Sequence, residues 1–350
     1  MGFASSSGTV LGRYVDRDSY VLVVGGAGYI GSHMSKLLSD HGLKPIILDR
    51  SSDGGLRVDR FGEFVVGDMA DRRLLKDIFN SYKISTVFHF AALSVVGSSI
   101  THPADYYQNN LAKTLVLLDS MRDFEVNNII FSSTAAIFGE PIYVPIDESH
   151  PKRPVNPYGA SKLMVESVLA DYADAYGLSS VSLRYFNACG AEPDSGLGED
   201  HYPETHLIPI ALQAALGLRP HLEIFGTDYP TTDGTCVRDY VHVTDLCAAH
   251  FSAYRKLVDG SLKGASCFNL GNGDGFSVKQ VVDVVRSIVA EDGLKLHVVE
   301  REARVGDPSV LIADSKVSRH VLDWIPKYRD LDSMVRHAWA WEKSKQGIIG

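Results

Sequence analysis

The stretch YVLVVGGAGYIG, residues 20–31, decides the fold. It begins with a continuous β-prone apolar run, Tyr20–Val24, which is typical of a strand that is covered on both faces. Glycines follow at once, and Gly25, Gly28 and Gly31 lie at the spacing G-x-x-G-x-x-G. Apolar residues then recur at helical spacing. The stretch therefore predicts a strand, a tight glycine turn and a helix.

The glycine turn is the first candidate binding site. Residues without a Cβ allow a tight turn and let the backbone approach a pyrophosphate closely, while the helix N-terminus offers N–H groups and a positive dipole end to that anion. Asp49 ends the next predicted strand, where its carboxylate can accept hydrogen bonds from an adenosine ribose. A 2′-phosphate would be repelled there, so the cofactor is predicted to be NAD, although Arg50 could moderate this preference. Asp68, which follows the third strand, is a candidate contact to adenine.

The rest of the first half alternates short apolar runs with helical patterns, which predicts an α/β fold with a doubly wound, parallel, Rossmann-type sheet. Helices are expected after the glycines, over Leu74–Phe79 and around Leu111–Met121. The expected strands are Tyr20–Val24, Pro45–Leu48, Phe64–Val66, Thr86–Phe90, Asn128–Ser132 and Val181–Tyr185.

The second half lacks this regular alternation of strand and helix patterns, which indicates a smaller α/β C-terminal domain for the substrate. It holds a loop rich in Gly, Pro and acidic residues, a helix near Ile208–Leu216 and short strand-like segments. Two later segments, Asp239–Val243 and Cys267–Gly271, could return to the first domain. We expect a mobile N-terminal tail over residues 1–18, an NAD-binding domain over residues 19–186 and a substrate-binding domain over residues 187–350.

Tyr158-Gly159-Ala160-Ser161-Lys162 is the candidate catalytic group. Pro157 precedes it and a helix follows, so Tyr158 and Lys162 lie about one turn apart on one helix face. A tyrosine with a free pKa of about 10 is a poor base, but a nearby ammonium group favours its phenolate form. The pair could then take a proton from a sugar hydroxyl while hydride leaves to NAD. On its own, however, such a pair is more often an ordinary solvated helix face.

A strand end strengthens this interpretation. Ser132, Ser133 and Thr134 end a predicted buried strand at its carboxyl edge, where open α/β sheets bind their ligands. A hydroxyl at that edge can orient the reacting oxygen. The glycine turn, the strand-end hydroxyls and the Tyr-Lys helix follow one another along the chain in the expected order. Three motifs that agree on one site are stronger evidence than any one of them alone.

Composition excludes several other classes of protein. The 350 residues are 45% hydrophobic, so the chain is globular, and its formal net charge of −9 argues against a nucleic-acid partner. No apolar run reaches the roughly 18 residues of a membrane span, and the N-terminus has no secretory leader, so we expect a cytoplasmic protein without membrane contact. The four cysteines form no CxxC pair and no nearby histidine spacing suggests zinc, so no metal is expected.

Further motifs give the chain a resemblance to the extended short-chain dehydrogenase/reductases, and within them to the UDP-hexose 4-epimerases, from about Tyr20 to Trp341. The most specific is IFGTDYPTTDGTCVRDYVHV, residues 224–243. The others are HFAAL (89–93), YYQNN (106–110), NPYGASK (156–162), LRYFNACGA (183–191) and FNLGNG (268–273).

This resemblance implies roles for individual residues. Tyr158 would be the base, Lys162 its electrostatic partner and Thr134 the hydroxyl bonded to sugar O4. Asn187, Arg238 and Arg304 would hold the diphosphate and uridine, which suits the arginine fork. The other expected substrate contacts are His206, Leu207, Phe225, Asp307 and Leu311. The expected cofactor contacts are Gly25, Gly28, Tyr29, Ile30, Gly31, Asp49, Asp68, Met69, Phe90, Ala91, Ala92, Asn109, Ser132, Tyr158, Lys162 and Tyr185.

The residues after Thr134 help to choose the reaction. Dehydratases and decarboxylases of this family carry an acidic residue there, whereas this chain has Ala135 and Ala136. The resemblance therefore implies reversible epimerisation at C4 of UDP-glucose and UDP-galactose through a 4-keto intermediate, with bound NAD as transient hydride acceptor, in a homodimer. Three alternatives stay open: a 4-epimerase of UDP-xylose/UDP-arabinose or another UDP-sugar, a simple NAD dehydrogenase, and a non-catalytic nucleotide sensor of the same fold.

Four positions depart from the family pattern. Ser94 stands where many epimerases have lysine, and Ser98 where they have glutamate, which puts cofactor contacts there in doubt. His206 replaces a frequent asparagine. Leu311 stands at a position that gates the sugar pocket, and its branched side chain predicts that N-acetylated sugars are poor substrates.

Overall fold

A computed structural model describes residues 19–51, 58–304 and 307–348 of the protein. The predicted tail, residues 1–18, lies outside the described residues. Within the described part of the chain, no helix has the length and apolar character needed to cross a membrane.

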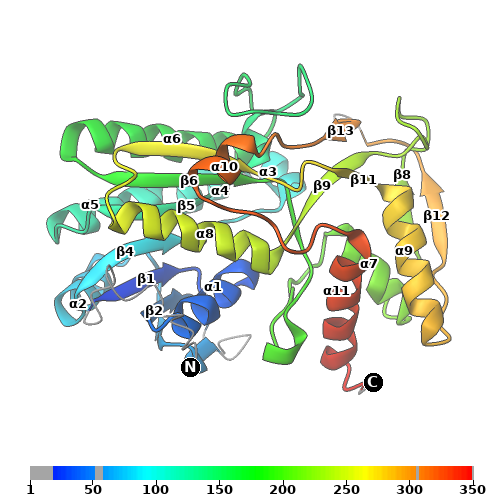
Figure 1. The fold of residues 1–350 in the computed structure, drawn as a ribbon, viewed down its shortest axis with the longest axis horizontal. Coiled ribbons are helices and arrows are strands. Elements are labelled where there is room, and N and C mark those ends of the chain that lie inside the picture. The colour runs from blue at the N-terminus through cyan, green and yellow to red at the C-terminus, as the bar shows by residue number, and fades with distance from the viewer. Residues whose placement is uncertain (1–18, 52–57, 305–306, 349–350) are drawn as a thin grey trace, which may run out of the picture.

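A seven-stranded parallel sheet forms the larger part of the molecule, so the predicted α/β fold class is confirmed (Figure 1). Its strand order is β10-β6-β5-β4-β1-β2-β3, and every neighbouring pair is parallel. The bounds are β1 Tyr20–Val24, β2 Lys44–Asp49, β3 Glu63–Val66, β4 Ile84–His89, β5 Asn128–Thr134, β6 Ser179–Tyr185 and β10 Ala265–Leu270.

The six strands expected from the first half are all present, and the seventh comes from a late segment. Strand β10 covers most of Cys267–Gly271 and pairs with β6. The other late segment, Asp239–Val243, does not return to this sheet. It lies mainly in β9 (Val237–His242), whose partners belong to a smaller sheet.

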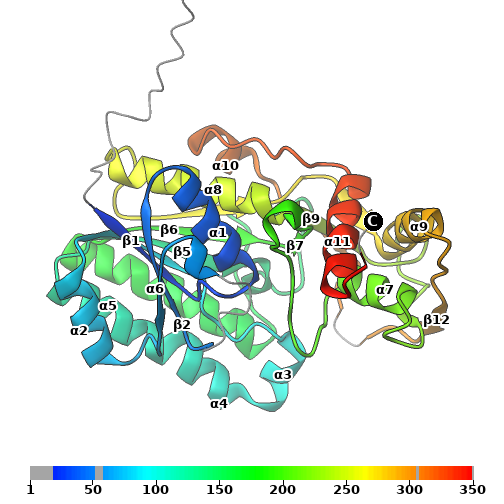
Figure 2. The ribbon, with the colours of Figure 1, turned by 90° about the horizontal axis from the view of Figure 1, so that it is seen from below.

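Helices cover both faces of the large sheet because alternate residues of each buried strand point to opposite sides. Val21 and Val23 belong to one core with helix residues Met34 and Leu246. Their neighbours in the strand, Leu22 and Val24, belong to a second core on the other face. In Figures 1 and 2, α6 and α8 lie on opposite sides of the sheet. The helices around the sheet are α1 Tyr29–Asp40, α8 Val243–Val258 and α10 Lys316–Val321 on one face, and α2 Arg72–Ser81, α5 Lys113–Asp123 and α6 Pro157–Tyr176 on the other.

A smaller unit stands beside the carboxyl edge of the sheet and has its own core (Figure 1). Its helices are α7 Leu207–Ala215, α9 Val278–Glu291 and α11 Leu331–Lys345, which gather at one end of the molecule in both views (Figure 2). A four-stranded sheet joins β7 Asn187–Cys189, β9, β11 Gly275–Ser277 and β13 Val310–Leu311, and a second sheet pairs β8 Leu222–Phe225 with β12 Val298–Arg301.

Short helical segments complete the described chain, and one of them corrects a predicted helix. The helix expected around Leu111–Met121 begins earlier, as a π-helix over Tyr107–Ala112 that runs into α5. The wider π turn places Asn110 inside, where its side chain bonds both the N–H and the C=O of Leu93 at 2.8 and 3.0 Å. The other short segments are η2 Val58–Arg60, α3 Val96–Thr101, α4 Pro103–Tyr106, η4 Ala135–Ile137 and η5 Pro193–Ser195.

The strand order places a topological switch between β1 and β4. The chain leaves β1 toward β2 on one side and leaves β4 toward β5 on the other. A crevice opens at the carboxyl ends of such strands, and ligands of open α/β sheets bind in it.

Candidate active site

A cleft of about 1480 Å³ lies between the carboxyl edge of the large sheet and the smaller unit. Typical pockets for small ligands are about 300–1,000 Å³, so this cleft has room for two nucleotide-sized ligands. Every predicted site residue lines it except Ser132. The Ser132 hydroxyl bonds the Tyr185 hydroxyl at 2.8 Å, so this serine lies behind the wall of the cleft.

One wall, the glycine-loop wall, is formed by Gly25, Gly28, Gly31, Asp49 and Asp68. Its turn is tight: a Cβ on Gly31 would stand 2.1 Å from the Gly25 carbonyl oxygen, and Gly25 has φ +79°. Helix α1 begins just after Gly28 with no side-chain cap and no acidic residue in its first turn. The wall therefore offers a bare helix N-terminus to an anion, as a dinucleotide pyrophosphate requires.

Two carboxylates complete this wall. Asp49 accepts hydrogen bonds from the N–H groups of Ala27 and Ser51 at 3.0 and 3.1 Å, which fixes it at the end of β2. Asp68 pairs with Lys113 at 2.5 Å. Burial would raise the pKa of Asp68, but the Lys113 contact and the Ala70 N–H outweigh it and lower the pKa. Lys113 lines the cleft and escaped the sequence analysis, because only the fold brings it to Asp68.

Thr134 and Tyr158 meet at the floor of the cleft because α6 packs unusually close to η4. The Asn156 side chain caps α6 by accepting the Gly159 N–H at 2.8 Å. A Cβ on Gly159 would stand 2.4 Å from the Ala136 carbonyl oxygen. The glycine after Tyr158 therefore permits the approach that brings the tyrosine to the end of β5.

Burial dominates the electrostatics of the Tyr-Lys pair. It raises the pKa of Tyr158, against a hydrogen bond with Thr134 that lowers it. It also lowers the pKa of Lys162 to about 7. In the protein without ligands, the expected stabilisation of the phenolate by Lys162 is therefore outweighed. The free-energy cost of removing either charged group from water is larger than the attraction between them. Lys162 instead donates to the Ser132 carbonyl at 2.8 Å.

A buried polar group lies beneath this pair and holds α6 against the sheet. Glu166, one turn after Lys162, binds the Arg184 guanidinium through both oxygens at 2.9 and 2.6 Å. It also accepts the Ser133 hydroxyl at 2.6 Å. The helix that carries the tyrosine is therefore tied to β5 and β6 directly behind the cleft.

The opposite wall, the arginine wall, is formed by Asn187, His206, Phe225, Arg238 and Arg304. Arg238 pairs with Asp307. The Arg304 guanidinium lies 3.8 Å from the centroid of the Phe225 ring, in a cation–π contact. Leu311 on β13 pairs in register with Arg238, which places the predicted gate beside the predicted phosphate ligand. Two arginines thus face the space in front of the glycine-loop wall.

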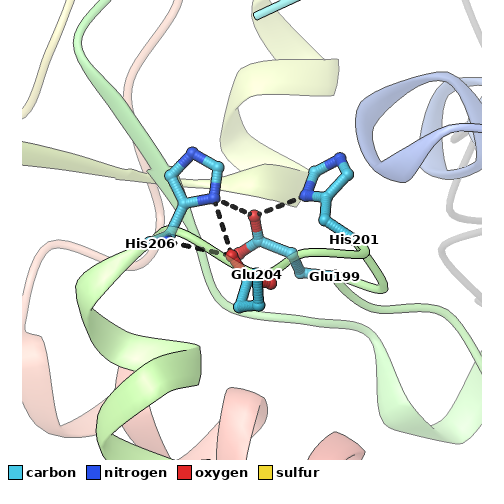
Figure 3. A group of neighbouring side chains, drawn as sticks. All are labelled: Glu199, His201, Glu204 and His206. Carbon is cyan, nitrogen blue, oxygen red and sulfur yellow. Dashed lines mark hydrogen bonds and ion pairs between the residues drawn. The ribbon is translucent and has the colours of Figure 1, made fainter. Parts of the chain in front are cut away.

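His206 belongs to a group of side chains that the sequence analysis missed (Figure 3). Its Nδ1 lies 2.6 Å from Glu199 and 3.1 Å from Glu204. Burial would lower the pKa of His206, but the two carboxylates raise it to about 10. Burial would likewise raise the pKa of Glu199, but His201 and His206 lower it to about 2. The end of the arginine wall therefore favours a positive charge.

Comparison with known proteins agrees with this geometry. Residues 21–271 match the model of the NAD dependent epimerase/dehydratase family. A relative from Halalkalibacterium halodurans, a UDP-glucose 4-epimerase, is 49% identical over 323 residues, which are 92% of this chain and 95% of the relative.

Solved structures give the same result. The UDP-glucose 4-epimerase of Brucella ovis in complex with NAD superimposes with a TM-score of 0.86 at 44% identity, over 92% of this chain and 97% of that one. The enzyme of Bifidobacterium longum in complex with NAD⁺ and UDP gives a TM-score of 0.87 at 35% identity, over 95% and 100% of the two chains. The family match covers well over half of the sequence, and this chain belongs to the NAD dependent epimerase/dehydratase family.

Proposed function

We propose that the protein is an NAD-dependent UDP-glucose 4-epimerase that interconverts UDP-glucose and UDP-galactose. One observation carries the proposal: Thr134, Tyr158 and Lys162 line the same cleft as the glycine turn and the two arginines. The cleft thus joins a dinucleotide site, a proton-transfer group and an anion site. Relatives named as UDP-glucose 4-epimerases cover nearly all of the chain.

The glycine-loop wall fits NAD. Its turn leaves no room for a Cβ at Gly25 or Gly31, whereas a Cβ at Gly28 would meet only the Gly25 oxygen, at 3.4 Å. Asp49 stands where a ribose diol can donate to it, and a 2′-phosphate would meet its negative charge. The chemistry that bound NAD supplies is the uptake and return of a hydride at C4 of the sugar.

Proton transfer falls to Tyr158. Its buried side chain, as the phenolate, takes the proton of the sugar O4 hydroxyl during oxidation and, as the phenol, returns it during reduction, while Thr134 holds the same oxygen by a hydrogen bond. Burial lowers the pKa of Lys162 to about 7, so its ammonium gives up a proton more readily than that of a free lysine. Burial alone makes the phenolate of Tyr158 unfavourable, and the positive charge of bound NAD⁺ would lower its cost.

Inversion at C4 requires the 4-keto sugar to present its other face. The arginine wall holds the uridine diphosphate through Asn187, Arg238 and Arg304, with Phe225 beside the uracil, and these residues leave the hexose ring free to rotate. The Arg238–Asp307 pair opens to receive the substrate, so that Asp307 turns to the uridine ribose. Binding energy from the nucleotide is then available for the reacting sugar.

The strand end disfavours the other reactions of the family. Ala135 and Ala136 follow Thr134 and form the first turn of η4. Neither can act as the acid that elimination or handling of a sugar carboxylate requires. After oxidation at C4, no acidic side chain at positions 135 and 136 is available to promote elimination, so the 4-keto sugar is reduced again.

Leu311 limits the room around the sugar. Its side chain packs against the small apolar cluster of Ile137, Phe138 and Ile146. We expect UDP-N-acetylglucosamine to turn over slowly, and Leu311→Ala to raise its rate relative to UDP-glucose about tenfold, as the loss of a few methylene groups allows. Side-by-side rates on the two sugars measure this, and fast turnover of the acetylated sugar by the unaltered enzyme would contradict it.

Three wider features belong to the same proposal. The NAD-binding domain spans residues 19–186 and the UDP-sugar-binding domain residues 187–350, with β10, α8 and α10 contributed to the first. The enzyme works in galactose metabolism in the cytoplasm. It is a homodimer through α5 and α6, which is supported by the exposure of Met164 and Tyr176 on α6, and light scattering of the purified protein would test the assembly.

The direct test of the activity uses UDP-galactose without added NAD. Chromatography should detect UDP-glucose, because the cofactor is regenerated in each turnover and stays bound. NADH that accumulates in step with product would indicate a simple dehydrogenase instead. No conversion even with NAD supplied would remove the catalytic assignment, and rates on UDP-xylose and UDP-arabinose would settle the choice of sugar.

A further inference from the structure

Four side chains converge in the segment that leads into α7. Glu199, His201, Glu204 and His206 each present one oxygen or nitrogen atom, and these four atoms lie within 4.8 Å of one another (Figure 3). Glu199 Oε1 is central, at 3.1 Å from His201 Nδ1 and 2.6 Å from His206 Nδ1. Glu204 Oε1 closes the group at 3.1 Å from His206 Nδ1.

The two carboxylates are buried, which calls for compensation of their charge. Their side chains are only 5% and 3% exposed. Glu204 Oε1 already accepts the N–H groups of Thr205 and His206, while its Oε2 is buried without a hydrogen-bond partner in the described part of the chain. Two buried carboxylates need positive charge beside them, and together with the two imidazole rings they are ligand types that a divalent cation binds.

We propose that Glu199, His201, Glu204 and His206 form a binding site for one divalent transition-metal ion of the Zn²⁺ type. Two carboxylates and two neutral imidazoles balance its charge and complete a four-ligand shell, as in closed structural zinc sites. Metal–ligand distances of about 2.0–2.1 Å put neighbouring ligand atoms about 3.3 Å apart in a tetrahedron. Three of the six pairs of ligand atoms lie 2.6 to 3.1 Å apart and all six lie within 4.8 Å, and the histidines, 43% and 45% exposed, have room to adjust.

The surroundings indicate a structural ion at the edge of the cleft. The Glu199 carbonyl accepts the Trp341 indole N–H at 2.8 Å, which links the segment to α11. The His201 ring meets the Tyr29 ring edge-on, with centroids 6.4 Å apart, which links it to the glycine loop. His206 precedes α7 and Leu207 begins it, and both line the cleft. The ion therefore joins both walls of the cleft, and this inference does not depend on the epimerase proposal.

Zinc titration of the whole purified protein tests the site. Protein treated with EDTA and dialysed should bind one equivalent of Zn²⁺ by calorimetry, with a rise in melting temperature. Mg²⁺ should do neither, because it prefers an all-oxygen octahedron. His201→Ala removes a half-exposed ligand and should weaken Zn²⁺ binding at least about 10–100-fold, and Glu204→Gln should do the same.

Matched variants separate this site from adventitious binding. His221 and Glu223 form another histidine–carboxylate pair on the cleft, at 3.6 Å, so His221→Ala should bind Zn²⁺ as the unaltered protein does. In EDTA, His201→Ala should melt at the temperature of the unaltered protein, which shows that it folds. The proposal fails if no Zn²⁺ binds, or if Zn²⁺ still binds with full affinity to the His201→Ala and Glu204→Gln proteins.

Discussion

The glycine-loop wall of the cleft is made mainly of backbone, whereas the arginine wall is made of long side chains. The glycine-loop wall presents backbone amides and glycines at the end of β1. A Cβ on Gly25 or Gly31 would collide with neighbouring backbone. On the second, Arg238 pairs with Asp307 and Arg304 stacks on Phe225. We expect the first wall to be preorganised, and the Arg238–Asp307 pair of the second to exchange partners when substrate binds. Rigid contacts suit a cofactor that stays, and exchangeable contacts suit a substrate that leaves.

The largest effect is expected where the two walls meet. Tyr158→Phe keeps the ring and removes the hydroxyl, so turnover should fall by at least about 10³-fold, within the range of a lost general base. Initial rates on UDP-galactose measure it, while the absorbance of bound NAD should not change. Tyr143→Phe, which alters an exposed tyrosine bonded to Asp147, is the control. Substantial activity in Tyr158→Phe would remove the assignment of the base.

Adding a single Cβ atom at Gly31 should disturb the glycine-loop wall. In Gly31→Ala the new Cβ would stand 2.1 Å from the Gly25 oxygen, so the turn must shift. We expect a loss of about 1–3 kcal/mol in the free energy of unfolding of the cofactor-free protein, together with loss of NAD. Guanidinium titration measures the first.

Gly28→Ala is the matched change in the same loop. Its Cβ would be at ordinary contact distance, 3.4 Å from Gly25 oxygen. The cofactor-free protein should therefore unfold as the unaltered protein does. If both substitutions lowered the free energy of unfolding equally, the close approach of Gly31 to the Gly25 oxygen would not be what determines the stability of this turn.

The arginine wall should respond in affinity rather than in stability. Arg238→Ala removes a charge-assisted contact worth about 1.5–3 kcal/mol, so KM for UDP-galactose should rise about 10–100-fold, with a smaller change in kcat. Steady-state kinetics separate the two. Arg301→Ala, which breaks the exposed Arg301–Glu223 pair on β12, should leave KM unchanged. A fall in kcat alone would place Arg238 in the chemical step instead.

Acid should destabilise the large sheet and its helices, which carry three buried histidines. Burial lowers the pKa of His33 to about 4, of His89 to about 3 and of His250 to about 4. The unfolded chain protonates near pH 6.5, so it binds more protons and stability falls as the pH drops from 6.5 toward 4. The slope is about 1.4 kcal/mol per pH unit for each histidine.

Substitution of one histidine isolates its contribution to this slope. His250→Phe keeps a ring beside Phe90 and removes the titrating group. The pH slope of the unfolding free energy should then decrease by the contribution of one proton, about 1.4 kcal/mol per pH unit. His102→Gln, at an exposed site, is the control. An unaltered slope in His250→Phe would mean that this histidine does not stay neutral in the folded protein.

The difference between the walls also explains what the sequence could predict. The strands and the glycine turn follow from local patterns, and the six predicted strands are present because a buried parallel strand reads as a short apolar run. For Cys267–Gly271 the sequence predicted only a possible return to the first domain, and it did not predict the π-helix at Tyr107–Ala112, since the form of both segments depends on distant partners such as Ser182 and Leu93.

Within the site, motifs bring nearly all of the expected residues to one cleft, but pairs across the chain escape them. Asp68 and Lys113 are 45 residues apart in sequence. Glu199 and His206 are close in sequence, yet the cysteine and histidine spacings typical of metal sites do not include E-x-H-x-x-E-x-H, residues 199–206. The roles of the lining residues remain predictions that the experiments above test.

The position of β10 has a consequence for how the chain is made. This edge strand of the large sheet is contributed by residues 265–270, after the polypeptide has already passed through β7, α7, β8 and β9. During synthesis the dinucleotide-binding sheet therefore cannot be completed until most of the second unit has left the ribosome. A fragment that ends near residue 186 would expose the outer edge of β6, with its row of unpaired amides and carbonyls open to other chains.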